Sequence, residues 1–363
     1  MKEFGIQEKL SSESVLAIEY CYAASISKPQ ITYTSPDWIS RLRIHDQFGL
    51  ISACYDGLLR RFVSPYDKPV SQRLGHSGSI KDFSFFPQSD DSKVLLVSGG
   101  TDLKARAWEL SEAGFEQTAV FTGHKDSIQA LSAFPESASS LRFISASWDG
   151  EILIWSSSSG AAPTVSKKRR VQVEDEVKQE SPLLEIDEPV ARLHEHSGSV
   201  SSLVWPHPLA FYSAGWDDKL IHWDAQRGEV VSCWSSGQTT AFLCLDYSLS
   251  ANLFVSGHSD ASVRTWDPRT TSRARTGAIS TFKSHAKWVN DVCWFKGEGK
   301  FVSCSTDQTV KLWDLRSNIP LATMNLREGV WPLSVTVDRD ETIFCGSSDS
   351  SLQVFRSESS IRQ

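Results

Sequence analysis

The chain repeats one pattern of apolar and polar positions. Short apolar runs alternate with polar turns, as in FVSCS-TDQT-VKLW, and this pattern predicts two antiparallel strands joined by a tight turn. The turn contains an Asp, and an aromatic residue follows six positions later in seven places. The seven pairs are Asp56/Phe62, Asp102/Trp108, Asp149/Trp155, Asp217/Trp223, Asp260/Trp266, Asp307/Trp313 and Asp349/Phe355. Such self-similarity predicts an all-β protein built from seven copies of one meander.

Two more residue types recur at regular places. A Ser stands four positions before the Asp in six copies, and Cys345 takes its place in the last one, while four copies have a His upstream. Because buried polar groups need partners, we expect the Asp to accept from the His, and the His to link through the Ser hydroxyl to the Trp indole. The expected sets are His76, Ser98, Asp102 and Trp108; His124, Ser145, Asp149 and Trp155; His196, Ser213, Asp217 and Trp223; and His285, Ser303, Asp307 and Trp313.

Short dipeptides in these units point to a known family. Gly-His occurs at 75–76 and 123–124, and Trp-Asp begins at 223, 266 and 313. With these marks the chain resembles the WD40 family over about nine tenths of its length. The resemblance implies a seven-bladed β-propeller with four-stranded blades. Few residues follow the last unit, so we expect the strand QITYTS, at 30–35, to close the ring by pairing with 351–356.

One connection is longer than the others. Successive turn Asp residues are 46, 47, 68, 43, 47 and 42 positions apart, so about twenty extra residues fall between the third and fourth units. The extra segment is Ser-rich, then basic, then acidic, which predicts a disordered insertion over 160–190 between blades 3 and 4. The propeller is then divided into 29–159, with the closing strand and blades 1 to 3, and 191–358, with blades 4 to 7.

Composition excludes several classes of function. The net charge of −7 argues against a surface built mainly for phosphate, so protein partners are the better hypothesis. The start, MKEFGIQEKL, has no apolar signal region, and we expect a cytosolic or nuclear protein. The seven cysteines are odd in number and lack C-x-x-C spacing, so we expect buried free thiols.

Ser, His and Asp recur together, as they do in a hydrolase triad. An enzyme needs one such set in a cleft, whereas this set is repeated in four units and is assigned to fold stability, so we predict a protein that is not an enzyme. The run His194-Glu195-His196 is metal-like, but His196 belongs to its blade and no further ligand cluster follows. We therefore expect no cofactor and no metal held by this chain alone.

A basic tetrapeptide, Lys167, Lys168, Arg169 and Arg170, lies in the predicted insertion. It stands alone in an otherwise acidic segment, which favours a nuclear import signal over a solvated charge run.

Tryptophan is abundant, and only five of thirteen fill the repeat position. With the first strands aligned, Trp38, Trp288 and Trp331 share one position, where the other units have Ser79, Ser127, Ser199 and Ala241. Their units are the first, sixth and seventh, which are neighbours in a closed ring. We predict an arc of indoles that binds a partner; packing between blades is the alternative.

A closer resemblance starts at the N-terminus. LSSESVLAIEYCYAA followed by SPDWISRLRI resembles the junction between a ubiquitin-like domain and the propeller in the ribosome-biogenesis WD-repeat factors of the PeBoW, or Nop-seven, complex. SACYDGLLRRF, LGHSGSIK and SASWDGEILIW resemble early blades of that family. The resemblance implies a scaffold for 60S subunit assembly and rRNA maturation in the nucleus, nucleolus and nucleoplasm. It also implies a trimeric complex with a Bop-type WD40 protein and pescadillo on pre-60S particles.

The same resemblance implies remodelling by the AAA ATPase midasin. In that family a glutamate of the ubiquitin-like domain completes a metal site on midasin, and LSSE places it at Glu13. The chain departs from the family before residue 10, so 1–28 is interpreted as a remnant of that domain and a linker. A shortened gene model and a natural loss of the release signal both account for this departure.

An alternative function is that of a substrate receptor for a cullin ubiquitin ligase. It rests on two W-D-x-R boxes, at 266–269 and 313–316. Such boxes arise often where the third strand of a blade ends, so they carry little weight.

Overall fold

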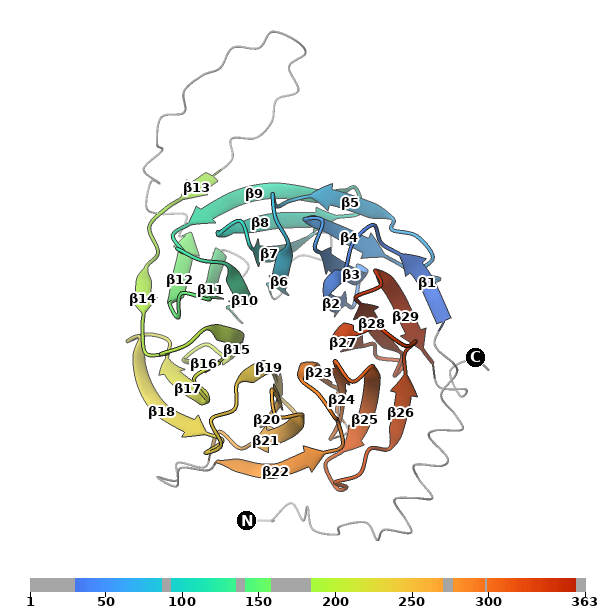
Figure 1. Cartoon of the computed structure of the whole chain (residues 1–363). Helices are drawn as coiled ribbons and strands as arrows, with labels where there is room; N and C mark the ends of the chain where they lie inside the picture. Colours follow the sequence, from blue (N-terminus) through green and yellow to red (C-terminus); the bar gives the residue numbers. More distant parts are fainter. Residues whose placement is uncertain are drawn as a thin grey trace.

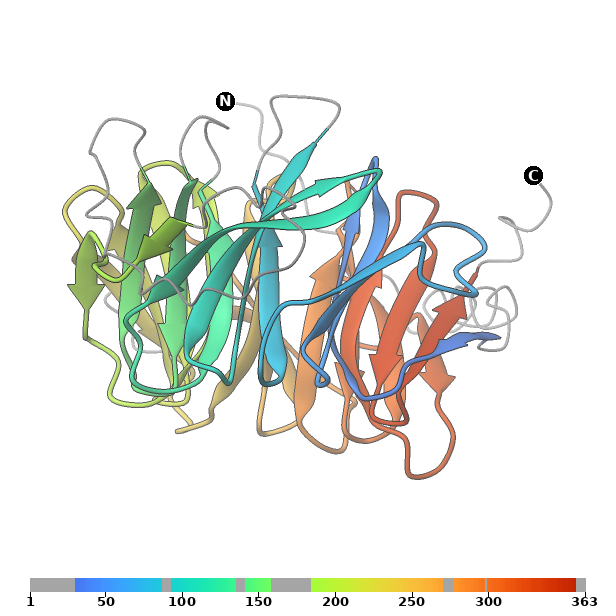
Figure 2. The ribbon, with the colours of Figure 1, turned by 90° about the horizontal axis from the view of Figure 1, so that it is seen from above.

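A computed structural model describes residues 30–86, 93–134, 141–157, 184–269, 277–297 and 299–356. Within these ranges the chain forms 29 strands and no helix, and the strands assemble into seven sheets around a central axis (Figure 1). Seen from the side, the strands run from one face of the ring to the other (Figure 2). The predicted seven-bladed β-propeller is confirmed.

The first three blades follow the predicted units, with strands ordered from the innermost to the outermost. Blade 1 has β2 (Ile39–His45), β3 (Gly49–Cys54), β4 (Leu58–Phe62) and β5 (Ser71–Leu74); blade 2 has β6 (Ile80–Phe85), β7 (Val94–Gly100), β8 (Lys104–Ser111) and β9 (Gly114–Thr122); blade 3 has β10 (Ile128–Ala133), β11 (Leu141–Ser147), β12 (Ile152–Ser157) and β14 (Ala191–Leu193). All pairs of neighbours within these four-stranded sets are antiparallel.

The other four blades have the same order. Blade 4 has β15 (Val200–His207), β16 (Ala210–Gly215), β17 (Lys219–Asp224) and β18 (Glu229–Ser235); blade 5 has β19 (Phe242–Ser248), β20 (Leu253–His258), β21 (Ser262–Trp266) and β22 (Ala278–Lys283); blade 6 has β23 (Val289–Trp294), β24 (Lys300–Ser305), β25 (Thr309–Asp314) and β26 (Ala322–Asn325); blade 7 has β27 (Pro332–Val337), β28 (Ile343–Ser347), β29 (Ser351–Phe355) and β1 (Gln30–Thr34). Each innermost strand lies beside the central axis (Figure 1).

Blade 7 closes the ring as the sequence predicts. Its outer strand, β1, pairs antiparallel with β29, and Gln30 is opposite Val354 while Thr34 is opposite Ser351. The amide of Ser35 extends the ladder by donating to the carbonyl of Ser350 over 2.7 Å. The first and last described strands therefore share one sheet, and β1 covers the edge of β29 that would otherwise be unpaired.

The apolar core lies between blades. The buried apolar side chains of the described residues form seven clusters, and each cluster combines residues from two neighbouring blades. One of them joins Ile154 of blade 3 to Trp223 of blade 4. A single blade buries little on its own, so its stability depends on both neighbours.

The long connection differs from the prediction. The outer strand of blade 3, β14, comes after the insertion, so the extra residues fall inside blade 3, between β12 and β14, and not between blades 3 and 4. The spacing of turn Asp residues could not reveal this, because it counts residues without assigning them to a strand connection. The predicted boundary at residues 190 and 191 consequently cuts through blade 3.

The end of the predicted insertion is ordered into a strand. Residues Leu184–Ile186 form β13, which pairs in parallel with β9 and adds a fifth strand to the outside of blade 2 (Figure 1). Leu184 and Ile186 also pack against the apolar cluster between blades 2 and 3. These residues correct the expectation of disorder over the whole of 160–190; positions 160–183 lie outside the described residues.

Candidate functional site

The repeated polar set forms a hydrogen-bonded chain in the interior of four blades. In blade 6, His285 Nδ1 lies 2.9 Å from Asp307 Oδ2 and His285 Nε2 lies 2.7 Å from Ser303 Oγ. The indole of Trp313 donates to the same Ser303 oxygen over 2.8 Å. The equivalent atoms meet in blades 2, 3 and 4 at His76, Ser98, Asp102 and Trp108; His124, Ser145, Asp149 and Trp155; and His196, Ser213, Asp217 and Trp223.

The Ser, His and Asp residues that resemble a catalytic triad are hydrogen-bonded to one another inside the blades. The side chains of Ser98, Ser145, Ser213 and Ser303 have no exposed surface. Burial lowers the pKa of His76 and of His285, so each imidazole is neutral and bridges its Asp and Ser. A serine that is sealed from solvent and already bonded on two sides has no route to a substrate. The recurrent sets are therefore structural.

Burial and hydrogen bonding compete at the turn Asp residues. Burial by itself would raise the pKa of Asp149, but the hydrogen bond from His124 and the backbone amides of Glu151 and Lys125 outweigh it and lower the pKa to about 2. Asp102 and Asp307 have lowered pKa values for the same kind of reason, with His76 and His285 as the respective donors. These Asp residues stay ionised and hold the turn.

Blade 5 contains a variant of the network. Its histidine, His258, lies within the second strand, and its Nε2 lies 2.8 Å from Ser256 Oγ, which also accepts from the Trp266 indole. Burial lowers the pKa of His258 to about 3. Its turn residue, Asp260, pairs with Arg264 in place of a histidine. The sequence pattern predicted the Ser, Asp and Trp of this blade. It did not predict the histidine, because His258 follows the Ser, whereas the histidines of the other four sets precede it.

One backbone contact repeats in all seven blades and fixes the register of the predicted Trp arc. The residue before the innermost strand, which we term the rim residue, accepts a hydrogen bond of 2.8–3.1 Å from the residue before the turn Asp, which we term the turn-flanking residue. From blade 1 to blade 7 the rim and turn-flanking pairs are Trp38/Tyr55, Ser79/Thr101, Ser127/Trp148, Ser199/Trp216, Ala241/Ser259, Trp288/Thr306 and Trp331/Ser348.

Trp38, Trp288 and Trp331 thus occupy equivalent positions on one face of the ring, which we call the rim face. Their exposed fractions are 39%, 49% and 42%, so none of the three is a core residue. Blades 6 and 7 share an apolar cluster, and so do blades 7 and 1. The three indoles therefore belong to three consecutive blades. In blade 1, Trp38 packs edge-on against Tyr55 with ring centroids 5.4 Å apart.

Two further tryptophans lie on the rim face and were missed by the sequence analysis. Trp148 and Trp216 are turn-flanking residues, with exposed fractions of 55% and 46%. The rings of Trp216 and Trp288 meet at 6.1 Å and nearly at right angles, although blade 5 lies between their blades in the ring. Blade 5 presents only the small Ala241 and Ser259 at its rim and turn-flanking positions. The sequence signal that could have identified these two tryptophans is their position directly before the turn Asp.

A hollow of about 550 Å³ adjoins Trp288 on the rim face. Its other walls come from the turns of blades 5 and 6, namely Ser259, Asp260, Ala261, Ala286, Lys287 and Thr306. The rim face therefore combines exposed indoles with a concave, partly polar surface, which is the composition of a protein-binding site.

A charged cluster joins the innermost strands. Arg41 of β2 contacts Asp82 of β6 at 2.9 Å and Asp291 of β23 at 2.7 Å. Asp291 also accepts from the hydroxyl of Ser334 and the amide of Val335 in blade 7. These groups bind four blades to one another, so the cluster has a structural role.

Other predicted features are placed as follows. Glu13 and Lys167 to Arg170 lie outside the described residues, as does one of the seven cysteines. The six described cysteines are free thiols, and four of them are buried. Cys293 is half-buried and Cys233 is exposed, since it lies on the outermost strand of its blade, which corrects the expectation that all are buried. Within the described ranges no group of three or more His, Cys, Asp or Glu residues has the geometry to hold a metal.

Two smaller observations concern the alternative functions. In both W-D-x-R boxes the Arg pairs with the Asp two positions before it, at 2.7 Å for Asp267 and Arg269 and 2.6 Å for Asp314 and Arg316. The boxes are thus explained as local turns after a third strand. No helix that is long and apolar enough to cross a membrane is found in the described part of the chain.

Fold, network and exposed face together define a WD40-repeat β-propeller, and the WD domain, G-beta repeat family model matches residues 115–156, 187–224, 229–267 and 277–314. The ribosome biogenesis protein WDR12 homologue of Chlamydomonas reinhardtii is 30% identical over 348 residues, which cover 88% of this chain and 75% of that protein. The homologues of Arabidopsis thaliana and Oryza sativa are each 29% identical, over 98% and 97% of this chain and 81% of each relative. The chain belongs to the WDR12 family of ribosome biogenesis proteins.

Proposed function

We propose that this protein is a non-catalytic scaffold in nucleolar assembly of the 60S ribosomal subunit and in rRNA maturation. The observation that carries the proposal is the cluster of exposed tryptophans on one face of a closed ring, in a chain of the WDR12 family. The recurrent Ser, His and Asp side chains are held inside the blades, so the rim face offers surface for docking and no repeated reactive group.

The rim-face tryptophans suit an interface better than a core. An indole side chain has about 150–250 Å² of surface, so an exposed fraction near 40% leaves roughly 80 Å² in water. At about 25 cal/mol per Å², covering that area contributes about 2 kcal/mol for each indole. Trp38, Trp288 and Trp331 are held by the strand register and therefore lose little conformational freedom on binding.

The proposed partners are a Bop-type WD40 protein and pescadillo, in a trimeric complex that joins pre-60S particles. We assign the rim face to the WD40 partner, because aromatic anchors around a concave surface suit a large, preformed protein surface. Presentation of Glu13 to midasin and nuclear import through Lys167 to Arg170 belong to the same proposal. The proposed locations of the protein are the nucleus, the nucleolus and the nucleoplasm.

The decisive experiment combines Trp288→Ala with Trp331→Ala. Tagged wild type and double variant are recovered from nuclear extract, and the co-purified WD40 partner and pescadillo are measured by immunoblot. We expect at least a tenfold loss of both partners, because anchor residues cost about 2 kcal/mol or more each when truncated. The matched control is Leu209→Ala with Leu249→Ala, which removes exposed apolar side chains from turns between the first and second strands of blades 4 and 5.

Two results would decide against this use of the rim face. Unchanged recovery of both partners by a double variant with the wild-type melting temperature would refute it. An equal loss in the Leu209 and Leu249 control would show that the effect is not specific to the indoles. For the import signal, deletion of residues 167–170 is expected to abolish nuclear accumulation of a fluorescent fusion, and unchanged import would remove that part of the proposal.

A further inference from the structure

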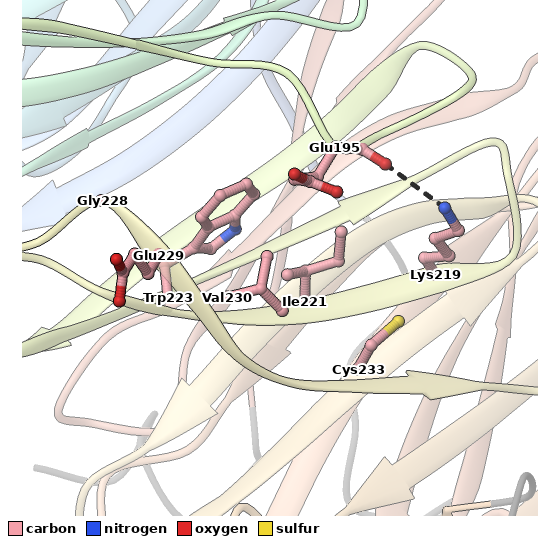
Figure 3. A pocket seen from close by; sticks show the side chains of 8 residues that line it. All are labelled: Glu195, Lys219, Ile221, Trp223, Gly228, Glu229, Val230 and Cys233. Atoms are coloured by element: carbon pink, nitrogen blue, oxygen red, sulfur yellow. Dashed lines mark hydrogen bonds between the residues drawn. The ribbon is translucent and has the colours of Figure 1, made fainter.

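A groove of about 340 Å³ opens on the outer wall of the ring, on the side of blade 4 that faces blade 3 (Figure 3). Ile221 and Trp223 of β17 and Val230 and Cys233 of β18 line it. Ile221 is opposite Cys233 and Trp223 is opposite Val230 in the ladder, so the four side chains project from the same side of the sheet. The groove is therefore an extension of the apolar interface between two blades.

The outer strand of blade 3, which precedes Glu195 of the groove, is short. The three residues of β14 pair only with Ile152–Ile154, although β12 continues to Ser157. In blade 4, β18 is the outermost strand of its sheet, so its outer edge pairs with no other described strand. Its exposed fractions are 41% at Val230 and 58% at Val231, which makes β18 an apolar edge strand. Such an edge presents unpaired amide and carbonyl groups to another strand.

Negative charge stands at both ends of the groove. Glu229 is at the first residue of β18, and Glu195 lines the other end, beside Lys219. Lys219 is already engaged, since its ammonium donates to the Glu195 carbonyl over 3.3 Å and lies 3.7 Å from Asp217. Among the described residues neither glutamate carboxylate forms an ion pair. The charged groups of the groove that remain available to a ligand are thus the two carboxylates.

Blade 2 shows that the outer edge of a blade in this ring accepts a further strand. There β13, with the sequence Leu-Glu-Ile, adds to β9 in parallel, and its two apolar side chains pack against the neighbouring cluster. The edge of β18 is the equivalent fourth-strand edge in blade 4, with an apolar groove beside it. The pairing of β13 with β9 in blade 2 therefore shows how an added strand can bind to β18 in blade 4.

We propose that the groove binds an extended peptide segment of a partner protein, which adds to β18 as a fifth strand. An aliphatic side chain of the peptide fills the hollow over Ile221 and Trp223, and Lys or Arg side chains at its two ends pair with Glu195 and Glu229. Paired strands rise equally, by about 3.3 Å per residue, so the seven residues of β18 can pair with a peptide of about six or seven residues. This surface is separate from the rim face.

The test uses a fluorescein-labelled peptide, Lys-Val-Thr-Ile-Thr-Arg, and the full-length protein. We expect saturable binding by fluorescence anisotropy, and protection of amides in Glu229–Ser235 by hydrogen-exchange mass spectrometry, because β18 gains a strand partner. Glu195→Lys combined with Glu229→Lys should weaken binding at least tenfold. The same variant should gain affinity for the charge-swapped peptide Glu-Val-Thr-Ile-Thr-Glu. The charge-matched control, Glu112→Lys with Glu116→Lys on exposed positions of blade 2, should bind like wild type.

Several results would overturn the proposal. They are the absence of binding to the wild type, equal weakening in the Glu112 and Glu116 control, and binding without protection of β18. A concentration-dependent doubling of the mass in sedimentation, abolished by the Glu195 and Glu229 changes, would instead assign the groove to a second copy of this chain. Melting temperatures of all variants are measured so that a folding defect is recognised.

Discussion

Ser303 offers the sharpest test of the polar network inside the blades. Its buried hydroxyl lies 2.7 Å from His285 Nε2 and accepts from Trp313 Nε1 over 2.8 Å. Ser303→Ala removes this oxygen without adding volume. A buried polar group left without a partner costs about 1–3 kcal/mol, and in this blade two ring nitrogens lose theirs. We therefore expect the free energy of unfolding to fall by about 2–6 kcal/mol.

Urea unfolding of the full chain, followed by circular dichroism, measures this change. An unchanged dependence on urea allows the shift in midpoint to be converted directly into free energy. The matched control is Ser197→Ala, in which the exposed hydroxyl is removed while the backbone amide still donates to Asp217. We expect a change below about 0.5 kcal/mol for the control.

Adding Trp313→Phe separates hydrogen bonding from packing. The chain already contains the corresponding combination in blade 7, where Cys345 replaces the Ser and Phe355 replaces the Trp, so that no indole needs an acceptor. The double variant should lose about 1 kcal/mol less than the sum of the two single changes, because each partner is then absent. Additive single changes, or a Ser303→Ala cost below about 0.5 kcal/mol, would refute the network as a source of stability.

Two further predictions concern charge. Burial lowers the pKa values of His76 and His285, so the unfolded chain takes up protons before the folded chain as the pH falls below about 6.5. The stability that these histidines contribute is therefore complete above that pH and is lost below it. In urea titrations between pH 7 and 5, the free energy of unfolding should fall by up to about 1.4 kcal/mol per pH unit for each histidine. A flat profile would contradict this. Arg41→Met should cost about 3–5 kcal/mol, because it removes the ion pair of the buried Asp291 carboxylate, while Asp82 keeps its contact with Arg43 at 3.1 Å. Asp291→Asn should restore part of the loss, and no restoration would contradict the ion-pair argument.

The closed ring was predictable because its signals are periodic and local. The turn Asp, the Ser four positions earlier and the aromatic six positions later mark the same hairpin in most copies, so strand order followed from counting. The closing strand followed from the repeat, since a four-stranded blade needs an outer strand and the segment at 30–35 has the pattern of one. Its register is fixed by the alternation of side chains toward the core.

The course of the insertion was not predictable in the same way. Nothing within Leu184–Ile186 distinguishes a strand that joins blade 2 from one that extends blade 3, because three residues carry almost no periodic signal. Its partner, β9, lies far earlier in the chain, and such a pairing depends on tertiary structure. Trp148 and Trp216 were missed for another reason. Only the backbone bond to the rim residue places the position before the turn Asp on the same face as Trp288.

The turn Asp explains why one residue persists in all seven copies while its partners change. The residue after it has a positive φ, between 61° and 80°, in every blade, and five of these seven residues are not glycine. In six blades the Asp carboxylate accepts from the amide two positions later, which holds the turn in this conformation. Blade 1 keeps this bond at Asp56 with neither the loop histidine nor the Trp, and uses Arg60 as the partner. The main role of the Asp is therefore to stabilise the backbone of the turn, and the histidine, serine and indole extend the hydrogen bonding in those blades where these groups are buried.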